Sequence, residues 1–211
     1  KVISQTDLQY LSGNWQKRLL TTFQMIPRMV ENSSEEWLDI IQRLLDVLKG
    51  LFGTNLICIY HAGADFPELR KLISLEELTL FPDTLPSSDL IRLSLPVLWT
   101  PGKRMTTHLH RSARIASVTY VASVAIGREN ALEGLIVVGG MDSQPPPLLL
   151  ETIEVVAVYI SQVISRSVFE ANTKREAARR EFQLQLYSSV YEEVQEGVMV
   201  VDPDSVIIEI N

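Results

Sequence analysis

Apolar side chains recur at steps of three and four residues at the beginning of the chain, which is the spacing of a helix with one buried face. The first predicted helix covers residues 5–30, and Pro27 is expected to kink or end it. Ser33 and Glu36 form a capping-box pair that predicts a second helix, which Gly53 should stop. The stripe of the second helix consists of Trp37, Ile41, Leu44, Leu48 and Leu51.

Short apolar runs rich in β-formers replace the helical spacing after residue 54. Pro96 places one of the resulting strands at a sheet edge or a bulge. Pro82 and Pro86 indicate that residues 81–90 form a loop, in which one helical turn is allowed. We predict strands at 56–60, 68–78, 94–99, 118–126 and 132–139, the last two as a hairpin, and a short helix at 105–115.

A long helix is predicted to follow Pro147, because apolar residues again recur at helical spacing up to about residue 194. Its apolar seam consists of Ile153, Val156, Ile160 and Val163, followed by a thinner stripe of Val168, Ala171, Ala178 and Phe182. A compact domain cannot bury so long a helix, so its second half should project and pair with another helix. A homodimeric coiled coil is the simplest partner, and an isolated solvated helix is the alternative.

Composition narrows the classes of partner. The formal net charge of the 211 residues is −7, which argues against a nucleic acid, because phosphate binding needs a dense basic face. We expect no membrane span and no signal peptide, because apolar runs are short and the amino end is polar. The single cysteine, Cys58, excludes an internal disulfide framework and fits a cytoplasmic location.

The middle of the chain resembles a GAF domain. The resemblance rests on the basic helix end 110–114, the apolar strand 120–126 and the glycine-containing strand 132–139, and it covers about residues 35–165. It implies an α+β fold in which helices flank an antiparallel sheet, with long helices at both ends of this chain. It also implies a regulatory sensor role without catalysis.

The carboxyl end resembles the first hairpin of a PAS domain, through the pattern from Glu196 to Asp202 and from Ile207 to Asn211. We therefore expect an N-terminal helix (1–32), a GAF-like domain (33–165), a coiled-coil linker helix (166–195) and the start of a truncated PAS-like domain (196–211). This order is similar to that of bacterial sensor histidine kinases. We expect a segment of a longer protein that carries an output domain, and a ligand-free dimerisation module of a transcription regulator is the alternative.

Many GAF domains bind a small molecule between the sheet and the middle loops, and polar-tipped aromatic residues with a base would suit such a pocket. The candidate ligand-binding residues are Tyr60, Trp99, Arg104, His108 and Tyr120. The alternative is that Tyr60 and Tyr120 only pack the sheet while Trp99 covers its edge. No particular ligand or cofactor is implied.

No catalytic constellation is found in the sequence, and we expect no enzyme activity in this segment. His108 and His110 would not converge on a metal from one helix, so we expect no metal site and predict both as surface histidines. Cys58 falls in a predicted core strand, which indicates a buried, inert thiol. A reductase would need reactive cysteines, and one buried thiol is insufficient.

Overall fold

The structure is a computed structural model. It describes residues 13–31, 36–62, 68–75, 80–104, 106–128, 131–193, 199–201 and 207–210. The chain divides into two compact units, Lys1–Ser165 and Arg166–Asn211. The boundary falls inside one continuous helix, and each unit is described separately below.

The first unit is built on one antiparallel sheet with the strand order β3-β2-β1-β6-β5-β4. The strands are β1 (Ile57–Ala62), β2 (Glu68–Ser74), β3 (Thr84–Pro86), β4 (Val97–Trp99), β5 (Tyr120–Arg128) and β6 (Ala131–Gly140). The predicted hairpin is confirmed as β5 and β6, and β4 is an edge strand directly after Pro96, as expected. The fold is the predicted α+β, GAF-like arrangement of a sheet flanked by helices.

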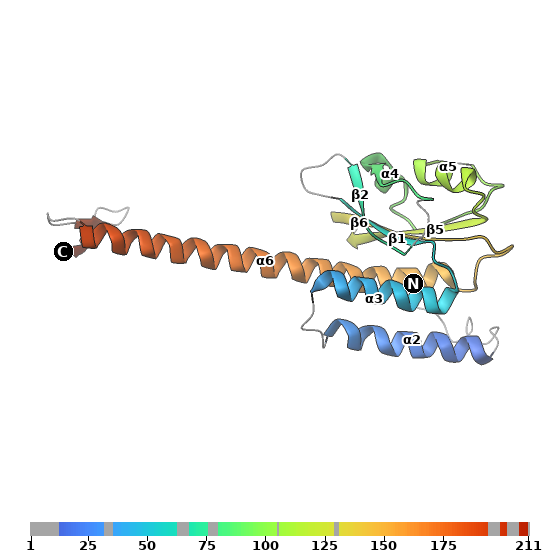
Figure 1. Ribbon diagram of the computed structural model, residues 1–211, viewed down its shortest axis with the longest axis horizontal. Coiled ribbons are helices and arrows are strands. Elements are labelled where there is room, and N and C mark those ends of the chain that lie inside the picture. The colour runs from blue at the N-terminus through green and yellow to red at the C-terminus, as the bar shows by residue number, and fades with distance from the viewer. Residues whose placement is uncertain are drawn as a thin grey trace. The chain divides into compact units, whose positions relative to one another are not determined.

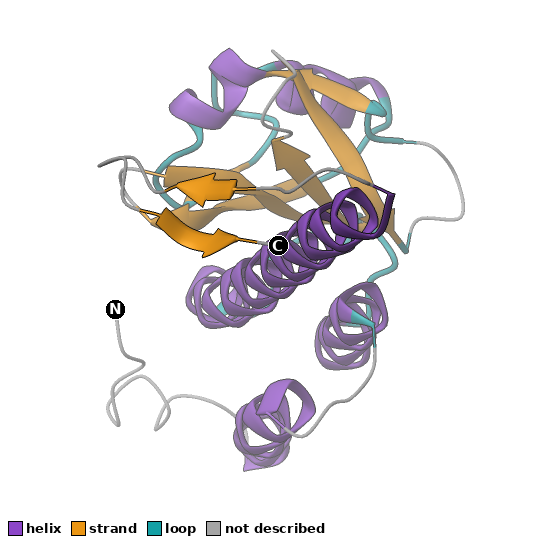
Figure 2. Ribbon diagram, turned by 90° about the vertical axis from the view of Figure 1, so that its left-hand side faces the viewer, coloured by secondary structure: helices purple, strands orange, loops and turns teal. Residues whose placement is uncertain are grey.

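Helices cover both faces of this sheet (Figure 1). Figure 2 shows α3 and the first part of α6 against one face, with α4 and α5 against the other. Helix α2 packs on α3, away from the sheet. The bounds are α2 (Gly13–Glu31), α3 (Trp37–Phe52), α4 (Ser87–Arg92), α5 (His108–Ile115) and α6 (Leu149–Glu193).

Because both faces are covered, the central strands are apolar at nearly every position and divide their side chains between two cores. The inner core lies between the sheet and helices α2, α3 and α6, and its sheet residues include Ile57, Ile59, Tyr120, Ala122, Val124, Ile136 and Val138. The outer core lies on the side of α4 and α5, and its residues include Cys58, Tyr60, Trp99, Leu109, Val121, Leu135 and Val137. Cys58 is fully buried, as predicted.

The ends of the first helices follow from local chemistry. Gly53 stops α3 as predicted: it adopts φ 71°, and its N–H donates to the Lys49 carbonyl. Pro27 lies inside α2, and the helix continues to Glu31. Ser33 lies outside the described residues, and α3 begins after Glu36, whose side chain makes no capping hydrogen bond.

The prediction of a loop at residues 81–90 was wrong in part: a helical turn was expected and is present in α4, but strand β3 was not. This stretch contains β3 and most of α4, and β3 pairs with β2 through Leu69 opposite Leu85. Proline is tolerated here because Pro86 ends an edge strand and precedes the first residue of α4.

Helix α6 contributes to the inner core through side chains that include Ile153, Val156, Ile160, Val163 and Ile164. Two hydroxyl groups one turn apart, Ser161 Oγ at 3.3 Å and Ser165 Oγ at 3.5 Å, donate to the Glu133 carboxylate at the start of β6. Among the described residues, one helical stretch, 149–186, is long and apolar enough to cross a membrane by length and composition alone. Its first part is accounted for by packing in the inner core.

The second unit begins with the distal part of α6, which is residues 166–193. Its side chains from residue 168 to 186 are exposed, and Arg166 pairs with Glu170 at 2.8 Å. The predicted terminal hairpin is present as strands β7 (Met199–Val201) and β8 (Ile207–Ile210), paired antiparallel. The predicted turn between them, residues 202–205, lies outside the described residues.

Candidate functional site

An aromatic stack joins the edge of the sheet to α5. Trp99 ends β4 opposite Val121, so its side chain points into the outer core, where it is 1% exposed. The His110 ring of α5 stacks on it with 5.6 Å between ring centroids and 11° between planes. The stack therefore fixes α5 over the edge of the sheet.

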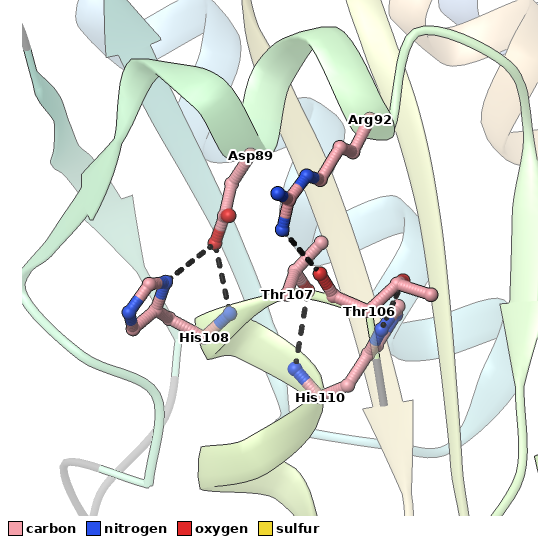
Figure 3. A network of polar contacts seen from close by, with 6 residues as sticks. All are labelled: Asp89, Arg92, Thr106, Thr107, His108 and His110. Atoms are coloured by element: carbon pink, nitrogen blue, oxygen red, sulfur yellow. Dashed lines mark hydrogen bonds and ion pairs between the residues drawn. The ribbon is translucent and has the colours of Figure 1, made fainter. Parts of the chain in front are cut away.

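Polar contacts fasten the start of α5 to α4 (Figure 3). The Asp89 Oδ2 atom accepts a hydrogen bond of 2.9 Å from the His108 backbone N–H and lies 3.4 Å from His108 Nδ1. The side chain of Thr107 caps the same helix end by accepting from the His110 N–H. A carboxylate is favourable there because it meets the positive end of the helix dipole. Arg92 adds a second link by donating to the Thr106 carbonyl at 2.8 Å.

Four buried polar atoms of the outer layer have no hydrogen-bond partner among the described residues. They are Asp89 Oδ1, Trp99 Nε1, His110 Nε2 and Ser123 Oγ. Each side chain is at most 1% exposed, and leaving such an atom unpaired costs about 1–3 kcal/mol. Buried polar atoms of this kind are uncommon in native proteins, so we define Asp89, Trp99, His110 and Ser123 as the polar cluster and treat it as the candidate site.

Sheet register explains how Ser123 joins this cluster. Ser123 lies opposite Val97 on β4, and Trp99 lies opposite Val121. Residues two apart on a strand share a face, so Ser123 lies on the same face of the sheet as Val121. Trp99 lies opposite Val121, which makes Ser123 and Trp99 diagonal neighbours on the outer side of the sheet.

Burial lowers the pKa of His110 below its ordinary value of 6.5, although the Asp89 carboxylate acts in the opposite direction. The Nδ1 atom of the ring lies 3.3 Å from Thr106 Oγ1. An imidazolium carries N–H groups on both ring nitrogens, and the buried Nε2 atom has no hydrogen-bond partner among the described residues. The neutral form of His110 is therefore favoured in the folded protein.

A pH dependence of stability follows from this buried histidine. As pH falls below about 6.5, the unfolded chain takes up a proton at His110 before the folded protein does, so the unfolding free energy should decrease until pH passes the lowered pKa of the folded state. Replacement His110→Phe keeps a flat ring on Trp99 and should remove this part of the decrease. Urea unfolding between about pH 5 and pH 8 measures the unfolding free energy of the wild type and of His110→Phe. The same dependence of this free energy on pH in both proteins would contradict the expectation.

The structure separates the five candidate ligand-binding residues. Tyr60 and Trp99 lie in the outer core, where the Tyr60 hydroxyl donates to the Pro82 carbonyl at 2.7 Å. His108 starts α5 with its side chain 57% exposed, and Arg104 is exposed in the preceding loop.

Tyr120 lies on the opposite face of the sheet, in the inner core. Burial, together with the negative charge of Asp142, raises the pKa of Tyr120 to about 12. Its hydroxyl has no hydrogen-bond partner among the described residues. Tyr120 therefore does not share a pocket wall with Tyr60 and Trp99.

The linker residues proposed for a helical dimer also fall into two groups. Ile160 and Val163 are 0% and 4% exposed in the inner core of their own unit. Val168 and Phe182 are 52% and 65% exposed, and Ala171 and Ala178 are exposed as well.

Sequence reasoning missed three members of the polar cluster, and the prediction of His110 as a surface histidine was wrong. His110 is 1% exposed, and its ring stacks on Trp99 in the outer layer. Two signals were available: Ser123 alternates with inner-core residues along its strand, and Asp89 precedes the buried Leu90 in a short amphipathic segment. Among the described residues, no group of three metal-ligating side chains is found.

No protein-family model matches this sequence, and no curated protein sequence matches it either. The fold is nevertheless shared with solved GAF domains. The phycoerythrobilin-bound GAF domain of a cyanobacterial phytochrome has a TM-score of 0.57 and 16% identity, over 74% of this chain and 98% of that one. The GAF domain of a two-component sensor histidine kinase from Bacillus halodurans has a TM-score of 0.51 and 13% identity, over 63% and 96%.

An enzyme has the same fold. The free methionine-R-sulfoxide reductase of Neisseria meningitidis has a TM-score of 0.59 and 12% identity, over 80% of this chain and 96% of that one. Identities this low show a common GAF-like fold and carry no activity or ligand across. Function therefore has to be argued from the residues of this chain.

Proposed function

We propose that this chain is a regulatory sensor and dimerisation module of a signal-transduction protein, and that this protein is a two-component sensor kinase. One observation carries the proposal: the helix that completes the inner core of the GAF-like unit, α6, is also the helix that continues for 28 residues beyond Ser165. A helix that is part of a domain core and also extends past it is suited to pass a change in that core along the chain.

The relay would start in the inner core. Ile153, Val156 and Ile160 pack with strand residues of the sheet, and Glu133 holds two serine hydroxyls of α6. Packed interiors respond to displacement by switching between discrete arrangements. A signal that favours one arrangement of the sheet would therefore favour one position of α6.

The sensed ligand would bind on the outer side of the sheet. Tyr60 and Trp99 lie in the core on that side, His108 starts α5, and Arg104 is exposed in the loop before α5. Tyr120 would act only from the inner core. The polar cluster supports a ligand with hydrogen-bonding groups, because it offers an indole N–H donor and a carboxylate acceptor that are unpaired among the described residues.

A second candidate is a ligand-free structural dimerisation module of a transcription regulator. It is favoured by the size of the side chains that fill the outer core, since Trp99, Tyr60 and Phe81 are all fully buried there. Native mass spectrometry of the purified protein separates the two candidates. A small molecule that co-purifies in stoichiometric amount supports the sensor, and a bare polypeptide mass supports the structural module.

We propose no catalytic activity for this segment. Sulfoxide reduction requires thiols that attack and resolve, and the only cysteine of the sequence, Cys58, is 0% exposed in β1. Neither candidate function needs a reactive side chain.

The dimer premise predicts a measurable association. In sedimentation equilibrium the 23.8 kDa chain should behave as a dimer at high micromolar concentration, because long unpaired helices are marginal in water. A mass that stays at the monomer value over this range would contradict both candidate functions.

A further inference from the structure

The two helices on the outer side of the sheet, α4 and α5, belong to a stretch of the chain with an unusual charge (Figure 2). Residues 84–128 contain six arginine and lysine residues and one acidic residue, Asp89, whereas the whole chain has a formal net charge of −7. The side chain of Asp89 is 0% exposed, and its Oδ2 atom accepts a hydrogen bond from the start of α5. The exposed side chains of this stretch therefore carry only positive charge, in a protein that is otherwise acidic.

Acidic side chains border this stretch at two points. Asp83 directly precedes it and pairs with Lys71 at 3.4 Å. Asp142 is exposed beyond the end of α5, where its backbone carbonyl accepts a hydrogen bond of 2.6 Å from Thr119. The positive surface is therefore confined to α4, α5 and the chain that joins them.

Three large apolar side chains protrude from the same region. Ile91 on α4 and Leu95 in the turn after it are each 73% exposed, and Ile115 at the end of α5 is 80% exposed. Every other large apolar side chain in the described part of the first unit is at most 59% exposed. Three such side chains in one positively charged stretch indicate a surface that meets a partner.

The basic and the apolar side chains share one side of α5. Arg111 and Ile115 lie one turn apart on the side that faces away from the sheet, and Arg114 lies beside them, with all three side chains exposed. Arg104 is exposed in the loop that leads into α5, and polar contacts fasten α4 to the start of α5 (Figure 3). We call Ile91, Leu95, Arg104, Arg111, Arg114 and Ile115 the basic face.

The spacing of the apolar side chains favours a lipid surface over a peptide. Ile115 is seven residues, or about 10 Å along the helix, from His108, where α5 meets α4. Ile91 and Leu95 lie on the other side of that contact, on α4 and just after it. A peptide would have to span both helices, whereas a bilayer meets protruding side chains on both without needing a matching shape.

The charge of the basic face also suits a lipid surface. Anionic headgroups attract arginine and lysine, and exposed apolar side chains enter the boundary between headgroups and acyl chains. The acidic remainder of the protein would be repelled by the same headgroups, so the basic face would be the side that approaches. We propose that the basic face docks on the surface of a membrane that contains anionic lipids. This inference goes beyond the proposed function and does not depend on its dimer.

Co-sedimentation of the full chain with lipid vesicles tests the proposal. The chain should bind vesicles of equal parts phosphatidylcholine and phosphatidylglycerol, and it should not bind vesicles of phosphatidylcholine alone. Added salt should weaken the binding, because salt screens the attraction between exposed charges. A chain that binds neither kind of vesicle would overturn the proposal and leave an acidic protein as the class of partner for this face. Equal binding to both kinds would overturn it as well.

The double replacement Arg111→Gln with Arg114→Gln should lower partition onto the anionic vesicles about 10–30-fold, because each arginine near such a surface contributes about fivefold. The control is Lys17→Gln with Arg28→Gln, which makes the same change in charge at exposed positions of α2, away from the sheet. Its partition should stay within about twofold of the wild-type value. An equal loss in the two double variants would show that net charge alone controls binding and would overturn the proposal.

The apolar contact has its own test. Ile115→Gln should lower partition onto the anionic vesicles about tenfold, because the isoleucine would no longer enter the lipid boundary. Met25→Gln, at an exposed position of α2, should leave partition unchanged. All the replaced side chains are exposed, so the midpoint of urea unfolding should stay the same and show that the variants are folded. An Ile115→Gln chain that binds like the wild type would overturn the proposed contact, while the dimer measured by sedimentation would be unaffected.

Discussion

Replacement Trp99→Ala is expected to lower the unfolding free energy by about 3–5 kcal/mol, because it removes one of the largest fully buried side chains. The indole fills the outer core at the end of β4 and supports the His110 ring at 5.6 Å. Trp99 is the last residue of β4, an edge strand of only three residues, so its stack on His110 joins this strand to α5. Urea unfolding followed by far-ultraviolet circular dichroism measures the change.

The matched variant Trp99→Phe separates packing from polarity. Phenylalanine retains an aromatic face for His110 and removes only the part of the ring that carries Nε1, which is unpartnered among the described residues. We therefore expect this variant to lose well under half as much stability as Trp99→Ala. Equal losses would show that Nε1 makes a bond that stabilises the fold.

Replacement Gly134→Ala is expected to cost about 3 kcal/mol, at the upper end of the usual range for overpacking. A Cβ atom at this position of β6 would overlap the backbone carbonyl oxygen of Tyr60 in β1. Backbone cannot rotate away as a side chain can, so the two central strands would have to separate locally.

Gly102→Ala is the control for this prediction. A Cβ atom on Gly102 would meet nothing within 4 Å, so the unfolding free energy should change by about 0.5 kcal/mol or less. If both replacements cost the same small amount, the close approach of Gly134 to Tyr60 would be contradicted.

Local signals predicted much of the fold. The Gly53 stop, the β5–β6 hairpin and the long helix after Pro147 depend on residues close together in the sequence, and each is present. The strand β3 was missed because its three residues become a strand only by pairing with β2. Pro86 is a local signal that favours a loop, and the pairing of β3 with β2 cannot be read from the sequence. The prediction therefore followed the proline.

The candidate site was harder to predict. Tyr60 and Tyr120 look alike in sequence, and they lie on opposite faces of a sheet whose central strands are apolar throughout. When both faces of a sheet are buried, the alternation of side chains along a strand shows which residues share a face. It does not show which helices cover that face. The burial of His110 depends on packing against Trp99, which belongs to β4 and lies outside the sequence pattern of α5.

The two outermost strands, β3 and β4, have a consequence for how this protein avoids unwanted assembly. Each is three residues long, β3 ends in Pro86, and β4 directly follows Pro96. Proline lacks an N–H for a new strand to bond, and short edges offer few sites for one. Growth of the sheet from one molecule into the next is therefore disfavoured at both borders of this sheet.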